Sequence, residues 1–114
     1  MSRDREYLLD IVEAAKLAVS YLAGKSREGF LHDTQCQDAV IRRLEIIGEA
    51  ARRVSHETKD RLPGVPWSAM VGMRNVITHQ YDDIDLGIVW NTVANDLPAV
   101  MDAIAKGLTS GQGA

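Results

Sequence analysis

Residues 34–54 read TQCQDAVIRRLEIIGEAARRV, and this stretch decides the fold class. Apolar side chains recur in it at alternating intervals of four and three residues, at Val40, Leu44, Ile47, Ala51 and Val54. This spacing places them on one face of an α-helix, as in the seam between packed helices. Thr34 followed by Gln37 matches a capping box. The sequence therefore predicts a helix that begins at Thr34 and runs to about Val54.

The segment before this helix has the same periodicity. A first helix is predicted from about Asp4 to Ala23, and Gly24 is a natural stop for it. Its apolar stripe consists of Leu8, Ile11, Val12, Ala15, Val19 and Leu22. A short helical turn is predicted over residues 26–31, with Ser26 as its cap.

Two more helices are predicted after residue 54. Residues 55–66 should form a polar break, because Pro63 and Pro66 interrupt a helix. A third helix should run from about Trp67 into residues 74–81. A last helix is predicted from about Leu86 to Leu108, bent at Pro98. Its apolar positions are Val89, Val93, Leu97, Val100 and Ile104.

These elements predict an all-α protein, a four-helix up-down bundle with one short extra helical turn. We expect a single domain over residues 1–109 and a flexible tail over residues 110–114. Apolar residues make up 46% of the chain and charged residues 25%, as in soluble globular proteins. No apolar run could span a membrane, and no signal-peptide region opens the chain. The single cysteine, Cys36, excludes an internal disulfide, so we expect a cytoplasmic protein.

Charge is unevenly distributed along the chain, whose net charge is −3. Residues 42–74 carry seven basic and four acidic side chains, whereas residues 75–114 carry one basic and five acidic. The basic segment could form a cleft that attracts phosphate groups. Alternatively, its arginines could be the solvated face of a helix, because Glu49 precedes Arg52 and Arg53 by the spacing of helix-surface ion pairs. The sequence leaves both readings open.

Residues 74–81 read RNVITHQY and combine the groups needed to act on a phosphodiester without a metal. The guanidinium of Arg74 can hold a phosphate through two parallel hydrogen bonds. The imidazole of His79 can accept or donate a proton near neutral pH. In one undistorted helix the two side chains would point about 140° apart. They would converge if the helix ended near Thr78, if the arginine stem bent round, or if two chains formed the site.

Each residue of this segment also has a purely structural reading. Arg74 or His79 could pair with the acidic turn that follows at residues 82–83. Tyr81 could cover the base of the last helix, and Asn75 could make only a local hydrogen bond. Neither reading is excluded by the sequence alone.

No metal site is expected. His32 and Cys36 have the spacing of two ligands on one helix face, but nothing completes a zinc site. Cys36 is better explained as a small buried residue. The acidic residues at positions 82, 83 and 85 could suggest magnesium, but capping of the last helix explains them more simply. Trp67 and Trp90 are predicted to anchor the core.

The chain resembles the HEPN domains of prokaryotic toxin–antitoxin systems, the HepT-like group. The signature of that group is an arginine, a polar residue, a few variable positions, a histidine, one further residue and a tyrosine. It is matched by Arg74, Asn75, His79 and Tyr81. Further similar segments are IIGEA at 46–50, PW at 66–67, GM at 72–73, IVW at 88–90 and DLP at 96–98. The resemblance covers roughly residues 5–105.

The resemblance implies a metal-independent endoribonuclease toxin of a type VII toxin–antitoxin system, acting on RNA without a cofactor as a homodimer or a higher assembly. By analogy, Arg74 would bind the phosphate and His79 would be the general acid–base. Asn75 would orient one of these groups or contact the phosphate. A minimal nucleotidyltransferase antitoxin would neutralise the toxin by attaching AMP to Tyr81.

A non-catalytic function is the alternative. In that case the domain would bind a nucleotide or dock a nucleotidyltransferase partner, and residues 74–81 would serve that interface alone. HEPN relatives of this kind typically lack the arginine or the histidine. Because Arg74 and His79 are both present, the resemblance favours the ribonuclease.

Overall fold

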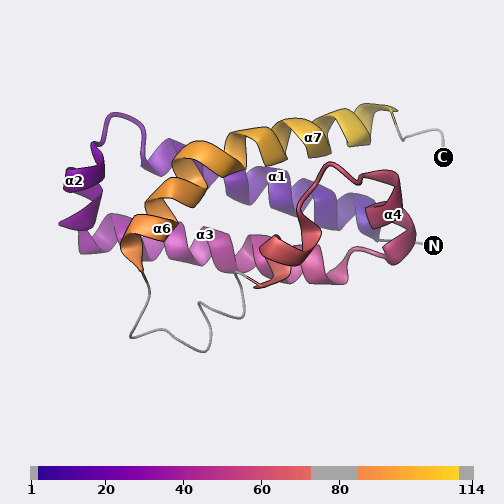
Figure 1. Ribbon diagram of the computed structural model, residues 1–114, viewed down its shortest axis with the longest axis horizontal. Helices are drawn as coiled ribbons and strands as arrows, with labels where there is room; N and C mark the ends of the chain where they lie inside the picture. Colours follow the sequence, from indigo (N-terminus) through magenta and orange to yellow (C-terminus); the bar gives the residue numbers. More distant parts are fainter. Residues whose placement is uncertain (1–2, 73–84, 111–114) are drawn as a thin grey trace.

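The computed structural model describes residues 3–72 and 85–110, and every regular element in these ranges is helical (Figure 1). The elements are α1 (Asp4–Tyr21), α2 (Arg27–Leu31), α3 (Thr34–Arg53), α4 (His56–Arg61), a helical segment at 67–72, α6 (Leu86–Asn91), the π-helical turn η2 (Thr92–Asp96) and α7 (Leu97–Ser110). The predicted all-α class is confirmed. Residues 73–84 lie outside the described ranges, and they include the whole predicted third helix after position 72. Residues 111–114 of the predicted tail lie outside them as well.

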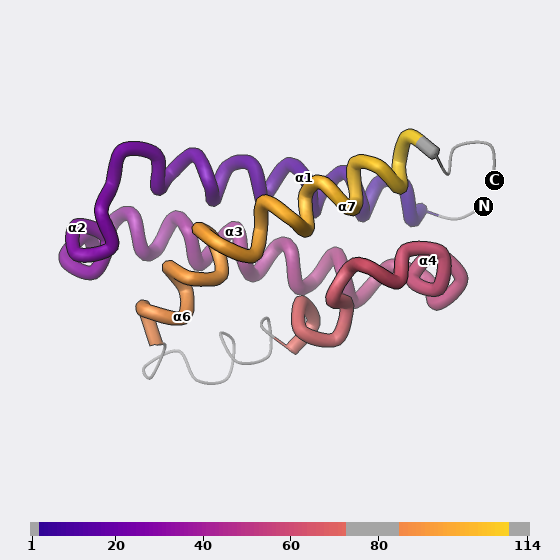
Figure 2. Tube along the Cα trace, turned by 45° about the horizontal axis from the view of Figure 1, so that its top comes forward, coloured from indigo at the N-terminus to yellow at the C-terminus, as the bar shows by residue number. Residues whose placement is uncertain are grey.

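The long helices are arranged side by side. α1 and α3 run antiparallel, and α7 lies along α1 in the direction opposite to it (Figures 1 and 2). α1 has its most extensive contacts with α3 and also packs against α7 and η2. α2 lies at one end of the bundle, where it contacts both α3 and α6. This arrangement is that of an up-down helical bundle.

The core follows most of the apolar seam predicted from the sequence. On α1, however, Val12 and Val19 are only half-buried, while Ala14 and Ala18 are buried. All five seam positions predicted on α3 are buried, and so are all five predicted for the last helix. The largest side chains with less than 2% exposure are Phe30, Ile11, Leu44, Ile47, Leu97, Ile104, Val40 and Val93. Full burial of one such side chain contributes about 1.5–3 kcal/mol. The seam between α1, α3 and α7 is therefore the main source of stability.

The corner between α1 and α3 differs from the prediction in two ways: α1 ends two residues earlier, and α3 has another cap. α1 ends at Tyr21, and Gly24 adopts a φ of +77°, which makes the turn without strain. Ser26 caps α2 as predicted, since its Oγ accepts a hydrogen bond from the Gly29 amide at 2.9 Å. The predicted capping box at Thr34 is wrong, because Asp33 caps α3 instead.

Two contacts explain why Asp33 is the cap. Its Oδ1 accepts a hydrogen bond from the Cys36 amide at 3.0 Å, and its Oδ2 pairs with Lys25 Nζ at 2.9 Å. The Gln37 side chain does not reach back to the helix start and instead donates to the Phe30 carbonyl at 3.0 Å. The cap therefore lies one residue earlier than predicted, where a cation from the preceding turn can also reach it.

The predicted polar break at residues 55–66 is wrong in part, because it contains the helix α4. Ser55 caps α4 through a hydrogen bond from the Thr58 amide to its Oγ. The carboxylate of Asp4 accepts hydrogen bonds from the Ser55 amide and from the hydroxyls of Ser55 and Thr58. Asp4 is distant in sequence, so this contribution to the start of α4 arises only from the fold.

The last helix bends as predicted, but through a π-helical turn. The amide of Leu97 donates to the Thr92 carbonyl, five residues earlier, directly before Pro98. Proline cannot donate a hydrogen bond and disturbs the preceding turn of a helix. The axis changes direction between α6 and α7 (Figure 1). α7 then extends to Ser110, two residues beyond the predicted end.

Candidate functional site

All four predicted site residues, Arg74, Asn75, His79 and Tyr81, lie within residues 73–84 and so outside the described part of the chain. Their roles and their mutual arrangement therefore stay predictions. The acidic residues at positions 82 and 83 fall in the same segment. What the structure describes is how the chain is held immediately before and after this segment.

The chain enters the segment from a helical turn at 67–72 that is anchored in the core. The Met70 amide donates to the Pro66 carbonyl at 3.1 Å, so proline occupies the start of the helix as predicted. Trp67 is half-buried, its Nε1 donates to the Leu62 carbonyl at 3.1 Å, and Lys59 Nζ lies 5.9 Å from its ring centroid. Met70 is 2% exposed. This side of the segment is held by both packing and a directional hydrogen bond.

The chain leaves the segment at a capped helix. Asp85 is the N-cap of α6, and its Oδ1 accepts hydrogen bonds from the amides of Gly87 at 2.9 Å and Ile88 at 3.2 Å. This confirms the capping role predicted for position 85. Further along α6, the ring of Trp90 lies 5.7 Å from that of Phe30 on α2, at an interplanar angle of 44°. Trp90 is half-buried, so both tryptophans pack against the core as predicted.

The basic residues of α3 divide into two groups. Glu49 Oε1 pairs with Arg52 at 2.7 Å and with Arg53 at 3.1 Å. These contacts raise the pKa of both guanidiniums, chiefly through the hydrogen bonds to Glu49. For these two arginines the helix-surface reading is confirmed. Arg42 is exposed, and the Nε atom of Arg43 is buried without a hydrogen-bond partner among the described residues.

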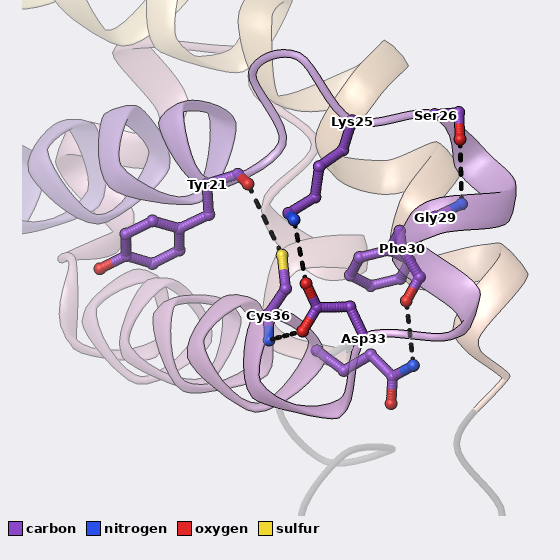
Figure 3. A network of polar contacts seen from close by, with 8 residues as sticks. Tyr21, Lys25, Ser26, Gly29, Phe30, Asp33 and Cys36 are labelled. Carbon is purple, nitrogen blue, oxygen red and sulfur yellow. Dashed lines mark hydrogen bonds and ion pairs between the residues drawn. The ribbon is translucent and has the colours of Figure 1, made fainter.

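His32 and Cys36 are engaged in separate contacts. His32 Nε2 lies 2.9 Å from Glu28 Oε1 on the exposed face of α2. Cys36 is buried beside the Lys25–Asp33 pair, and its Sγ donates to the Tyr21 carbonyl at 3.6 Å (Figure 3). Burial raises the pKa of the Cys36 thiol, and the charge of Lys25 opposes that shift. Within residues 3–72 and 85–110, no group of three or more potential metal ligands comes together.

The structure also brings together two residues that the sequence analysis did not connect, Arg27 and Gly87. Arg27 Nη2 lies 2.6 Å from the position that a Cβ atom on residue 87 would occupy, and its Cζ lies 3.7 Å away. The guanidinium therefore rests on the first turn of α6, just after residues 73–84. No periodicity or motif links an arginine in α2 to a glycine in α6, so only the packing of α2 against α6 reveals this contact.

No helix within the described ranges is both long enough and apolar enough to cross a membrane.

Known proteins similar to this chain point to one family. A family model described as "Ribonuclease HepT-like" matches residues 11–106, a span that includes residues 73–84. A protein of Thermococcus cleftensis named "Probable ribonuclease HepT" is 38% identical over 102 residues, covering 90% of this chain and 93% of its own length. A Methanocaldococcus jannaschii protein carrying the name "Putative RNase" is 36% identical over 96 residues, with coverages of 84% and 88%. No solved structure gives a significant match.

Proposed function

The chain belongs to the HepT-like ribonuclease family, and we propose that it is an endoribonuclease toxin that cleaves RNA without a metal ion. The observation that carries the proposal is the family match over residues 11–106, which spans the segment RNVITHQY. Within that segment, Arg74 and His79 supply the phosphate-binding cation and the proton-transfer group that this chemistry needs.

The reaction uses the 2′-hydroxyl of the substrate as the nucleophile. The 2′-oxygen attacks the adjacent phosphorus and loses its proton, while the bond from phosphorus to the 5′-oxygen breaks and that oxygen gains a proton. The products are a 2′,3′-cyclic phosphate and a 5′-hydroxyl end. His79 transfers protons in this exchange, and Arg74 stabilises the negative charge that develops on the phosphoryl oxygens. Asn75 orients one of these groups or contacts the phosphate.

The assembly proposed for this reaction is a homodimer. Arg74 and His79 diverge by about 140° in a regular helix, so a site that combines them from one helix requires a distortion. Two-fold symmetry would place two copies of residues 74–81 in one cleft and allow an arginine of one copy to act with a histidine of the other. The proposal requires only that both groups reach one phosphate.

Control of the activity is proposed to act through Tyr81. In a toxin–antitoxin pair, a nucleotidyltransferase partner would transfer AMP to the phenol oxygen and release pyrophosphate from ATP. The added phosphodiester would place a bulky anion beside Arg74 and His79, where the RNA phosphate must bind. Loss of RNA binding after this modification follows from charge repulsion and from steric exclusion.

The test is incubation of the purified protein with total cellular RNA in EDTA. We expect the parent to cleave RNA, and we expect His79→Ala and Arg74→Ala each to reduce the cleavage rate at least a hundredfold. Matched controls are His32→Ala and Arg5→Ala, which remove an exposed histidine directly after α2 and an exposed arginine on α1. Both control variants should retain the parent rate.

The intact mass of each preparation must be measured in parallel, because AMP on Tyr81 would silence the parent. Cleavage by unmodified protein that depends equally on His32 and His79 would contradict the assigned role of His79. Unmodified parent that leaves all RNA intact would overturn the ribonuclease proposal and favour the binding module.

A further inference from the structure

We infer that Arg27 is a second phosphate contact for the RNA strand, binding a backbone phosphate that flanks the one that is cleaved. The inference rests on the proposed ribonuclease function. Its basis is the position of the Arg27 guanidinium on the first turn of α6, in the space left by the missing side chain of Gly87.

The helix that carries Arg27 is fixed in place. Phe30 of α2 is fully buried and its ring contacts that of Trp90 on α6. The Phe30 carbonyl accepts a hydrogen bond from the Gln37 side chain on α3, and Ser26 caps the helix. Because α2 is tied to both α3 and α6, the base of the Arg27 side chain has a defined position beside α6. A preorganised cation loses less conformational entropy on binding a ligand.

The space for the guanidinium depends on glycine at position 87. A Cβ atom there would lie 2.6 Å from Arg27 Nη2, closer than such atoms can approach. It would lie 3.2 Å from Asp85 Oδ1, a less severe contact. Any side chain at position 87 would therefore displace the end of the Arg27 side chain, while the backbone of α6 could stay in place.

The guanidinium has donors available for a ligand. Lys25, two residues earlier, pairs with Asp33, but Arg27 makes no ion pair with any carboxylate in residues 3–72 or 85–110. The nearby Asp85 uses its Oδ1 to accept two amide hydrogen bonds from α6. An exposed guanidinium without an ion pair to these described residues matches the geometry of a phosphate, which it can bind in a bidentate manner.

Chain connectivity puts this cation near the proposed reaction. His79 is six residues before Asp85, so their Cα atoms are at most about 23 Å apart, at 3.8 Å per residue. Arg27 contacts the turn that starts at Asp85. A single strand that places one phosphate at residues 74–81 can bring a flanking phosphate to the start of α6. Basic grooves that follow the backbone in this way are typical of proteins that bind single strands.

The test measures RNA binding in the His79→Ala background, so that cleavage does not interfere. The probe is a fluorescently labelled single-stranded oligoribonucleotide of mixed sequence, titrated in EDTA at several salt concentrations. Adding Arg27→Ala should weaken binding roughly tenfold at low salt. It should also reduce the slope of log K against log salt concentration by about 0.7, the loss of one phosphate contact to a single strand.

Three further variants separate a phosphate contact from a structural effect. Arg5→Ala removes an exposed arginine in the first turn of α1, and this end of α1 is remote from α6 (Figure 1). The substitution should change neither the affinity nor the slope. Arg27→Lys should keep the slope but lose part of the affinity, because lysine retains the charge without the planar fork. Gly87→Ala should weaken binding about threefold by displacing the guanidinium, and it should have no further effect when combined with Arg27→Ala.

The possible outcomes distinguish the two proposals. If the His79→Ala parent binds RNA and Arg27→Ala leaves affinity and slope unchanged, the inference about Arg27 is wrong while the ribonuclease proposal stands. If Arg27→Ala lowers affinity no more than Arg5→Ala does, the same conclusion holds. If the His79→Ala parent binds no RNA and the unmodified protein also leaves RNA intact, both proposals fail.

Discussion

Two regions of the molecule are held together by different physical means. The seam between α1, α3 and α7 is apolar and distributed over more than a dozen buried side chains. The corner where α3 meets α4 depends on the single carboxylate of Asp4, which accepts hydrogen bonds from Ser55 and Thr58. The seam follows from a repeating pattern, whereas the corner requires one residue at one place. The comparison shows that stability and element boundaries come from different parts of this sequence.

The largest effect is expected from a truncation in the seam. Leu44 is 1% exposed, so Leu44→Ala should lower the free energy of unfolding by about 2–5 kcal/mol through lost burial and a residual cavity. Chemical denaturation followed by circular dichroism measures this change in the free energy of unfolding. Leu9→Ala is the matched control, because Leu9 is 46% exposed and its truncation should cost less than about 0.5 kcal/mol. Equal effects of the two substitutions would contradict the assignment of the seam.

A smaller and more local effect is expected at the corner. Asp4→Ala removes the shared acceptor of the Ser55 amide and two hydroxyls, and should cost about 1–3 kcal/mol because these groups lose their partner. Relative to the parent, Asp4→Ala should accelerate hydrogen exchange more at the amides of α4 than at the buried amides of α3. Asp10→Ala, an exposed aspartate on the same helix, is the control and should leave α4 protected. Uniform acceleration across both helices would mean that the corner is not an independent unit.

The smallest effect is expected at the cap of α3, and it depends on pH. Hydrogen bonds from the Cys36 amide and from Lys25 lower the pKa of Asp33. A carboxyl whose pKa is lower in the folded state stabilises the fold above its unfolded pKa of about 3.9 and loses that contribution as pH falls through the folded pKa. Asparagine can still cap the helix but cannot ionise.

The corresponding measurement is the melting temperature of the parent and of Asp33→Asn, from neutral pH down to pH values below about 4. The parent should be the more stable of the two near neutral pH, and the difference should shrink as the pH is lowered below about 4. Because the pair is exposed, high salt should reduce the difference as well. A difference that stays constant down to the acid transition would show that the ionised carboxylate adds nothing beyond capping.

Particular residues show how far the sequence predicted the fold. The positions of Val40, Leu44 and Ile47 repeat with the period of a helix, so their burial was predictable from spacing alone. Thr34 and Asp33 are both good caps, and the choice between them depends on Lys25, which only the turn at Gly24 brings into reach. Capping motifs are local, but competition between adjacent caps is decided by tertiary contacts.

The candidate site was predicted differently from the fold. Arg74, Asn75, His79 and Tyr81 were selected by the chemistry of their side chains and by a family resemblance. The family match supports the ribonuclease class. Their geometry lies outside the described residues and stays a prediction. Arg27 had no such signal, because its contact with Gly87 joins segments that are distant along the chain.

The sequence by itself determined the all-α class and most of the buried faces of the long helices, and it alone selects the candidate site residues, whose roles stay predictions. These properties depend on periodicity and on side-chain type, which are local and can be read along the chain. Only the tertiary structure decided the cap at Asp33, the helix after Ser55, the π-helical turn before Pro98 and the position of Arg27 on α6. Three of these features depend on polar or steric contacts between separate elements, and the fourth on how one helix accommodates a proline.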